Sequence, residues 1–460
     1  MSKIIRTLFD FEPGRAVVTR ELLLASDRGR ELIRQAKETA ARLGEKAKQD
    51  EPAWAIDQRR VAAGHARVLG LPSRDHELWR RIDFRTLEQA LPSLDPFRET
   101  AATRDLGDLP AALLERLGGE SGRVGLVVQR DSGVVIAQTA SELARQGVIV
   151  CPLGRALVEH GNLLRERLGA QIEPDYDGYA ALGAALRSGG ALVYVPDGVE
   201  AAVPIRLFDW LDGVGALAAP RTVIVLGKNA RATIVHEQLS ESAEGIAFHL
   251  GGTEVFLGQD AKLVYGTLQE WGRHVYHYSN QRVQVGRGAE LQWIQTILGG
   301  RMVKTNSYFN MIGPGAQVFV HGFMFGDGRQ QFHLHTLQRH LADHCTSDLL
   351  IKGCLKDRAR SIYQGLIQVA EGAQRTDAYQ ANRNLLLSDT ARADSIPGLE
   401  ILANDVRCTH GATIGSVDPE QVHYLMSRGL PRQDAQRLIV EGFFAPVIDR
   451  IPLEGIREHL

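Results

Sequence analysis

The sequence predicts a mainly β protein, in which a β-helix core lies between a helical N-terminal region and a helical C-terminal region. Two observations predict this fold: a short phrase that recurs every 27 to 31 residues past about residue 190, and helical composition on both sides of the repeats. Repeats of this length are typical of solenoids, in which each unit stacks on its neighbours. Because strand-like runs separate the turns, we expect a β-helix.

Residues 1–115 are expected to form the N-terminal helical region. Thr19 to Leu71 is rich in Arg, Glu, Ala and Leu at helical spacing and contains only one proline, Pro52. The following stretch from Leu91 to Leu109 is interrupted by Pro and Gly, which predicts a linker. Residues 116–189 alternate short apolar runs with helix-like stretches, so we expect a mixed α/β connecting region there.

Residues 190–415 carry the repeats and are assigned to the β-helix. The repeated phrase is an apolar residue, Gly, two variable residues and Ala, and its copies are Leu226 to Ala230, Leu257 to Ala261, Val285 to Ala289, Ile312 to Ala316 and a degenerate copy, Val369 to Ala373. Gly permits the backbone angles of a sharp corner, and a small Ala fits inside closely stacked coils. An antiparallel sandwich is the alternative, but its turns usually recur every 8 to 12 residues.

Residues 416–460 are expected to form a C-terminal helical region. Asp418 before Pro419 predicts a helix start, Gly429 a stop, and Pro431 the start of a second helix. The second helix carries a broad apolar stripe, Leu438, Ile439, Phe443, Phe444, Val447 and Ile448. Two hypotheses explain it: a surface for a partner protein, or packing against the first helix of the tail or the solenoid.

Composition restricts the class of protein and its compartment. The chain has 53 Lys and Arg against 55 Asp and Glu among 460 residues, so it lacks the basic excess typical of proteins that bind nucleic acids or anionic membranes. Four scattered cysteines do not suggest a disulfide framework and favour a reducing compartment, the cytoplasm. We expect neither a signal peptide nor a membrane-spanning helix.

Common catalytic motifs are missing from the sequence. It contains no GxxxxGK[ST] phrase, so we expect that this chain binds no nucleotide itself and that any ATP is hydrolysed by a partner. Gly213, Gly215 and Ala218 spell GxGxxA, but the surrounding sequence lacks the strand-to-helix context and favours coincidence. GxSxG, HExxH and paired CxxC motifs are also missing.

The densest group of potential metal ligands lies in one short stretch: His333, His335, His340, His344 and Cys345. If this stretch is extended, His333 and His335 point to one face of a strand. The alternative, which we favour, is that these histidines stack between coils with satisfied hydrogen bonds. Cys345 and Cys354 are expected to be buried as small apolar residues.

The second candidate site is the pair Cys408 and His410. On a strand, residues two apart project from the same face, about 6.5 Å apart. Thiolate and imidazole suit iron or zinc, but two ligands do not complete a tetrahedral site. The spacing alone therefore favours a structural role, and a functional site needs ligands from elsewhere.

Three phrases stand out in the last third of the chain: AQRTDAYQANRNLLLS from Ala373, PGLEILANDVRCTHGATIG from Pro397, and YLMSRG from Tyr424. They resemble the SufB/SufD family of iron–sulfur cluster assembly proteins. ALVYVPDGVEAAVPIRL from Ala191 and the helical region around Trp79 are also similar. The resemblance covers nearly the whole chain and implies a SufBD-type β-helix core flanked by helical regions.

Within this family the chain looks like SufD. In the SufB pattern a cluster-handling Cys lies where this chain has Ala391, and Glu-His-Glu-Ala lies where it has Thr409 to Ala412. The resemblance places His410 on the SufD histidine at the SufB interface, where a transient iron–sulfur cluster or iron is handled, and Cys408 in the same motif. It implies a scaffold subunit without catalytic residues, which assembles no cluster alone.

The resemblance also implies partners. The SufC ATPase supplies the missing P-loop, and the C-terminal helices resemble the part of SufD to which SufC docks, so Leu438, Phe443, Phe444 and Val447 are the expected contacts. The implied complex contains one SufB, two SufC and one SufD. Two other hypotheses stay open: a β-helix enzyme acting on polysaccharides, and a metal-free interaction solenoid.

Overall fold

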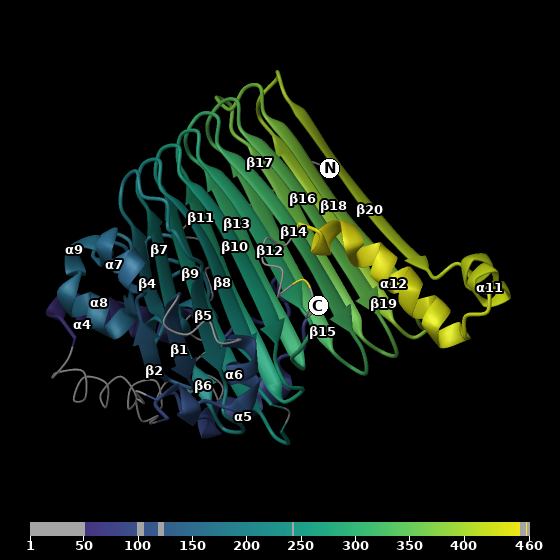
Figure 1. Cartoon of the computed structure of the whole chain (residues 1–460), viewed down its shortest axis with the longest axis horizontal. Helices are drawn as coiled ribbons and strands as arrows, with labels where there is room; N and C mark the ends of the chain where they lie inside the picture. The colour runs from purple at the N-terminus through teal and green to yellow at the C-terminus, as the bar shows by residue number, and fades with distance from the viewer. Residues whose placement is uncertain (1–50, 99–104, 118–123, 242, 451–456, 458–460) are drawn as a thin grey trace.

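The computed structural model describes residues 51–98, 105–117, 124–241, 243–450 and 457. Its main feature is a β-helix built from two largely parallel sheets, to which successive strands of the chain contribute alternately (Figure 1). Helices lie at both ends of the described sequence, so the predicted fold class is confirmed. The part of the helical prediction that falls on residues 1–50 lies outside the described residues.

The first sheet has the order β2-β1-β5-β8-β10-β12-β14-β16-β18-β20. Its strands are β1 (Gly125–Arg130), β2 (Gly133–Gln138), β5 (Ile205–Trp210), β8 (Arg231–Leu239), β10 (Lys262–Glu270), β12 (Glu290–Ile297), β14 (Gln317–Gly326), β16 (Thr346–Leu355), β18 (Asp377–Leu386) and β20 (Arg407–Ser416). Only the β1–β2 hairpin is antiparallel.

The second sheet has the order β19-β17-β15-β13-β11-β9-β7-β4-β3, and β6 (Leu217–Ala218) pairs beside β9. Its strands are β3 (Ile149–Pro152), β4 (Ala191–Val195), β7 (Arg221–Leu226), β9 (Ala247–Leu257), β11 (Val275–Val285), β13 (Met302–Met311), β15 (Gln331–His340), β17 (Arg360–Val369) and β19 (Arg392–Ile401). From β9 onward the register is unbroken, so equivalent residues of successive coils form straight rows.

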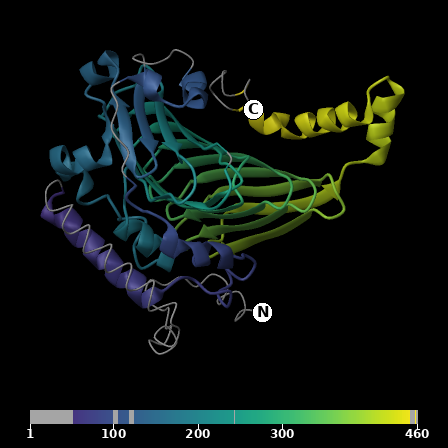
Figure 2. The ribbon, with the colours of Figure 1, turned by 90° about the horizontal axis from the view of Figure 1, so that it is seen from below.

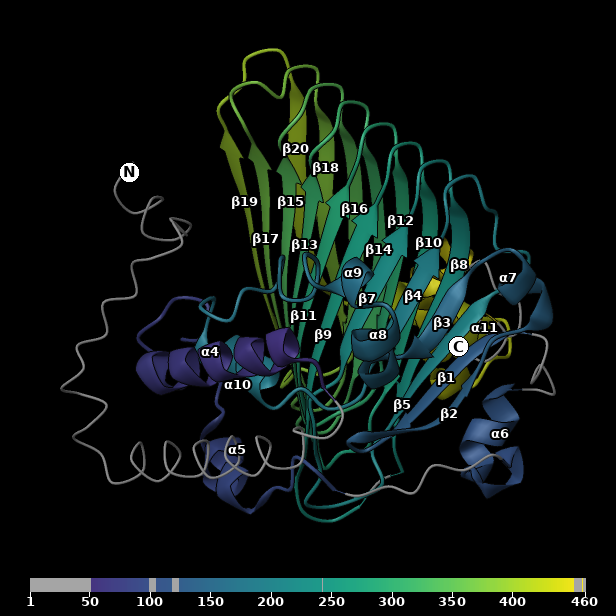
Figure 3. The same cartoon turned by 90° about the vertical axis from the view of Figure 1, so that its left-hand side faces the viewer.

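The repeated phrase forms the corners between the sheets, which rise as a staircase of turns in Figure 3. The four intact alanines, Ala230, Ala261, Ala289 and Ala316, are all fully buried. The residue before each of them has a left-handed backbone with φ of 54° to 72°, and it is Asn229, Asp260, Gly288 or Gly315. These residue types tolerate positive φ, which explains one of the two positions that looked variable in the sequence.

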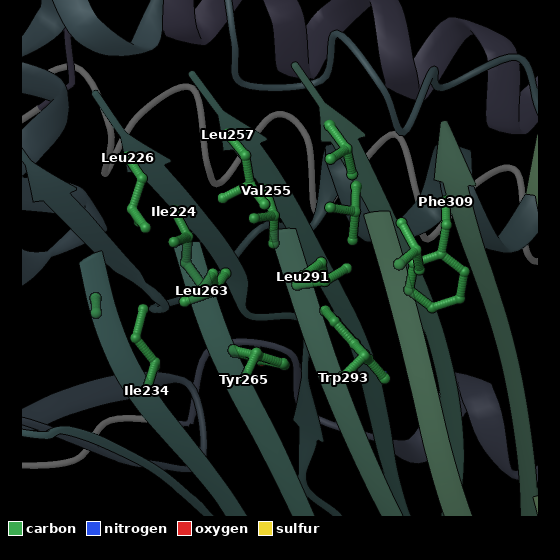
Figure 4. Close-up of a cluster of buried hydrophobic side chains, with 14 of the residues drawn as sticks. Ile224, Leu226, Ile234, Val255, Leu257, Leu263, Tyr265, Leu291, Trp293 and Phe309 are labelled. Carbon is green, nitrogen blue, oxygen red and sulfur yellow. The ribbon is translucent and has the colours of Figure 1, made fainter. Parts of the chain in front are cut away.

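Apolar side chains fill one half of the space between the sheets. Val255, Val283 and Phe309 form one row of the second sheet and face Leu263, Leu291 and similar residues of the first (Figure 4). These residues are almost completely buried, and burying such a side chain stabilises the fold by about 1.5–3 kcal/mol. The stacked apolar rows therefore hold consecutive coils together.

The N-terminal part packs against both sheets: residues 53–98 and 153–185 lie against the second sheet, and residues 106–117 lie against β1, β5 and β8 of the first. Its helices are α4 (Ala53–Leu69), α5 (Arg85–Ala90), α6 (Ala111–Leu117), α7 (Ser141–Arg145), α8 (Leu153–Glu159), α9 (Gly161–Leu164) and α10 (Gly178–Ala185), with 3-10 turns η1 (Leu91–Ser93) and η2 (Leu106–Asp108). Tyr179 of α10 stacks on Trp79 at 5.3 Å between ring centroids and contacts Tyr278 of β11. Leu91, Leu94 and Leu109 are buried, so the described parts of the predicted linker, residues 91–98 and 105–109, pack against the fold.

Two C-terminal helices follow the last strand: α11 (Pro419–Ser427), beyond the end of the sheets, and α12 (Arg432–Ile448) (Figures 1 and 2). The predicted helix signals are confirmed, since the Asp418 carboxylate accepts a hydrogen bond from the Glu420 amide at 2.9 Å and Gly429 has φ of 96° after α11. α12 returns across the outer face of the first sheet, where Phe444 contacts Phe323 at 5.0 Å between centroids.

Candidate functional site at the open end of the β-helix

The β-helix has an open end formed by β19 and β20. Among the described residues, β19 pairs only with β17 and β20 pairs only with β18, so each strand leaves one backbone edge unpaired. No side chain of β20 is fully buried, and all of β19 is at least partly exposed. Figures 1 and 2 show that α11 and α12 do not cover this edge along the length of β20.

Cys408 and His410 lie on the same face of β20, as the spacing predicts. Cys408 is in register with Ala378, which is buried in the interior, and His410 with Gln380, which is fully buried. Both residues therefore continue interior rows of the β-helix, on the last strand of the first sheet. Cys408 is half-buried and packs beside Leu399, whereas His410 is exposed.

The chemistry of the pair is that of an incomplete ligand set. Burial and the nearby Asp377 carboxylate raise the pKa of the Cys408 thiol, so the residue is protonated at neutral pH. Binding a metal ion would have to displace this proton, because the thiolate is the ligand. The described residues contain no group of three or more His, Cys, Asp or Glu that could hold a metal ion, so further ligands are needed.

The histidine-rich stretch does not form a site, which supports the alternative that we favoured. His333 lies 2.8 Å from Gln364 and His340 lies 2.9 Å from Ser347, both inside the fold, whereas His344 is exposed at a corner beside Asp343. His335 contacts the Tyr308 hydroxyl at 3.1 Å. Cys345 and Cys354 are fully buried, as expected.

Sequence reasoning missed a buried polar cluster at the other end of the β-helix. The Asp209 carboxylate lies 2.9 Å from Nε2 of His236 and 3.2 Å from Nε2 of His249, and His249 in turn contacts His277. Burial opposes ionisation of Asp209, but the two imidazoles outweigh it and hold its pKa below the ordinary value. The sequence contains a signal for part of this cluster. His249 and His277 are 28 residues apart, which is the length of one coil, so the repeat places them side by side.

The four residues proposed to contact an ATPase are not equivalent in the structure. Phe444 and Val447 are buried against the β-helix, Phe443 is half-buried, and 49 % of Leu438 is exposed. Within this chain, Phe444 and Val447 therefore fix α12 in place, and the exposed part of the stripe lies around Leu438. A shallow hollow of about 500 Å³ separates the two helices, lined by Asp418, Glu420, Gln421, Tyr424, Leu425 and Ile439.

Comparison with known proteins decides the family. Residues 210–443 match the model described as "SUF system FeS cluster assembly, SufBD core domain", and residues 126–207 match the "SufBD protein N-terminal region". The chain belongs to the SufBD family. These matches cover most of the connecting region, the β-helix and the C-terminal helices as far as residue 443, so the resemblance noted in the sequence is confirmed.

Relatives in the SufBD family include both paralogues. The chain is 30 % identical over 415 residues to the iron–sulfur cluster assembly protein SufD of Bacillus subtilis, which covers 90 % of this chain and 94 % of the relative. It is 25 % identical over 440 residues to SufB of the same organism, and the aligned part is 94 % of this chain and 92 % of that relative. A SufBD family protein of Pyrococcus horikoshii is 30 % identical over 377 residues, and the aligned part is 80 % of this chain and 83 % of that relative. The chain is therefore a SufD-like iron–sulfur cluster assembly protein.

Two features of this SufBD protein bear on its role. Ala391 is buried and packs with Leu355 and Ala359. This position therefore supplies no ligand here. Among the described helices, none combines the length and the apolar character that crossing a membrane requires.

Proposed function

We propose that this chain is a SufD-like scaffold subunit of an iron–sulfur cluster assembly complex. It pairs with SufB through the open end of its β-helix and binds SufC through its C-terminal helices. The subunit is not an enzyme, and the iron or nascent cluster is a transient cargo rather than a resident cofactor. The observation that carries the proposal is the open end, where two unpaired strand edges meet an exposed histidine.

Exposed strand edges favour pairing with another chain, and proteins usually cover them. Here both sheets end together, so one partner with the same architecture can extend both of them. A SufB relative aligns with 94 % of this chain, which makes a SufB-type β-helix a suitable partner. Such end-to-end pairing places interior rows of the two β-helices opposite each other, with Cys408 and His410 between them.

The ligand chemistry also favours a shared site. One thiol and one imidazole suit iron, but they leave two positions of a tetrahedral site unfilled. SufB would supply the remaining ligands across the interface. Because the Cys408 thiol has a raised pKa, we expect His410 to bind first and Cys408 to lose its proton only when the metal is present.

SufC binding is proposed for the exposed surface of α11 and α12. Tyr424 and Leu438 are 57 % and 49 % exposed, and Tyr424 lines the hollow between the two helices together with Ile439, the residue after Leu438. Exposed apolar groups rimmed by polar residues are typical of protein interfaces. SufC would supply ATP hydrolysis, since the sequence has no Walker A motif. We propose one SufB, two SufC and one SufD-like chain, acting in the cytoplasm.

The test is anaerobic co-expression of this chain with its cognate SufB and SufC, purification through a tag on this chain, and iron and sulfide analysis. We expect a stable complex whose iron and sulfide content falls severalfold in His410→Ala. His344→Ala is the matched control, because it removes an exposed histidine from a corner away from β20. Unchanged iron and sulfide in His410→Ala would exclude the proposed role of His410. Failure to recover SufB would favour the metal-free solenoid.

A further inference from the structure

Gln380, on β18, is the buried neighbour of His410. The two residues are in register in adjacent parallel strands, and Gln380 is fully buried. Neither its amide oxygen Oε1 nor its amide nitrogen Nε2 has a hydrogen-bond partner in the described structure. Leaving a buried polar group without a partner costs about 1–3 kcal/mol, and such groups call for a specific explanation.

None of the groups that surround Gln380 inside the fold makes a hydrogen bond to its amide. On the interior side of its row lies Leu349, an apolar core residue. Across the interior lies Gly365, where a Cβ atom would come within 2.6 Å of both Oε1 and Nε2, so the missing side chain makes room for the amide. The hydroxyl of Tyr363 nearby is already engaged by Thr336 at 2.9 Å.

The polar neighbour within the row of Gln380 is His410. Adjacent strands lie about 4.8 Å apart, so side chains in register stack within reach of each other. No other of these interior positions of β18 places a buried amide beside a potential metal ligand of β20. Ala378, which has no amide side chain, lies beside Cys408, and Asn384 lies beside the apolar Ile414. A buried amide without partners therefore stands next to the exposed imidazole of the candidate site.

We propose that Gln380 is the positioning residue of His410. The two side chains are not hydrogen-bonded in the structure as it stands, but rotation of the exposed imidazole brings one ring nitrogen to Oε1, which then accepts a hydrogen bond from the neutral ring and fixes its tautomer. The other ring nitrogen then keeps its lone pair for a divalent metal ion of borderline softness, such as Fe²⁺, at the open end. This inference rests on the proposed function of His410 and adds a second residue to that site. Metal-binding histidines generally donate their second nitrogen in this way.

The first test measures the tautomer of His410 directly. In the full chain labelled with ¹⁵N-histidine, NMR resolves the two ring nitrogens, and His410→Ala identifies the signal. We expect one dominant neutral tautomer in the wild type and a mixture in Gln380→Leu. Gln380→Glu, which keeps an acceptor oxygen, should restore the dominant tautomer. Asn384→Leu, which removes another buried amide of the same strand, should leave it unchanged.

The second test is titration with Co²⁺ under anaerobic conditions. We expect Gln380→Leu to weaken binding by about tenfold or more, the effect typical of losing such an outer-shell partner, and Asn384→Leu to leave it unchanged. An unchanged tautomer ratio in Gln380→Leu, or a mixture already in the wild type, would overturn the proposal. Co²⁺ binding that is insensitive to His410→Ala would instead overturn the function of His410, so the two failures are distinguishable.

Discussion

His249 and His277 contact each other through their Nδ1 atoms, 3.0 Å apart, inside the β-helix. The indole nitrogen of Trp271, which can only donate, also points at Nδ1 of His277 at 3.2 Å. Burial, and then the neighbouring His249, keep the pKa of His277 far below its ordinary value, so His277 is neutral and accepts at Nδ1. His249 must then donate at Nδ1, while its Nε2 faces the Asp209 carboxylate.

The first prediction is that the Asp209 carboxylate, which contacts the buried histidines, stabilises the folded chain. Replacing Asp209 by Asn removes the buried carboxylate that His236 and His249 contact, and leaving buried polar groups without their partner costs about 1–3 kcal/mol. We therefore expect Asp209→Asn to lower the free energy of unfolding by about 1–3 kcal/mol in urea denaturation. Asp212→Asn is the control, since Asp212 is partly exposed and pairs with Arg130 at the surface. Equal stability of the two variants would contradict the prediction.

The second prediction concerns Lys304, a fully enclosed lysine. Its ammonium group contacts the Leu78 carbonyl at 3.3 Å, His333 at 3.2 Å and the Trp79 ring at 4.8 Å. Burial lowers the pKa of Lys304 to about 7, against 10.5 for an ordinary lysine. Between these values the unfolded chain holds a proton that the native chain has lost, so stability rises with pH. We expect a contribution of about 1 kcal/mol per pH unit between pH 7 and pH 9.

Lys304→Met should remove this contribution. Denaturation at several pH values should show a smaller increase in stability between pH 7 and pH 9 than in the wild type. Lys262→Met, at an exposed surface lysine, should keep the wild-type slope. The prediction is contradicted if Lys304→Met and the wild type have the same slope.

The third prediction separates the anchor of α12 from its exposed face. Phe444 is buried against the first sheet, and the Lys352 ammonium donates to the carbonyl of Phe443 beside it. We expect Phe444→Ala to increase hydrogen exchange throughout α12 at least tenfold while the β-helix strands keep their protection. Leu438→Ala should leave exchange in α12 unchanged, because Leu438 is largely exposed. Equal exchange in both variants would show that the α12 anchor lies elsewhere.

The fourth prediction tests the open end as the pairing surface. Ile414 on β20 is 47 % exposed, and Ile414→Glu introduces a charge that an interface would have to desolvate. We expect SufB recovery to fall at least tenfold in co-purification, with an unchanged melting temperature for the isolated chain. Leu341→Glu is the matched control, since Leu341 is 46 % exposed at a corner and lies two coils before the end. Loss of SufB in both variants would argue against a specific edge.

Much of the fold could be predicted from the sequence because its signals are local and periodic. Each corner repeats a Gly and an Ala because the corners of successive coils lie so close together that larger side chains do not fit there. Asp418 and Gly429 mark α11 because capping depends on neighbouring residues. The shared face of Cys408 and His410 follows from the two-residue period of a strand.

Other features depended on the register between coils. The His333 to Cys345 stretch looked like one ligand group, but β15 carries His333 and His335 on one face and His340 on the other, and His344 and Cys345 lie at the corner before β16. Asp209, His236 and His249 lie on three separate strands, β5, β8 and β9, and meet only because two adjacent coils stack. Likewise, nothing local to Gln380 indicates that it lies beside His410, and the burial of Phe444 depends on where α12 crosses the sheet.

The open end also sets a gradient of local stability along the β-helix. A coil in the middle is held by backbone hydrogen bonds to two neighbours, whereas β19 and β20 are each held from one side only. In a solenoid, stability is approximately a sum over such neighbouring contacts, so the last coil opens at the lowest free energy. His410 thus sits on the coil that frays first, and a partner that docks there would stiffen it.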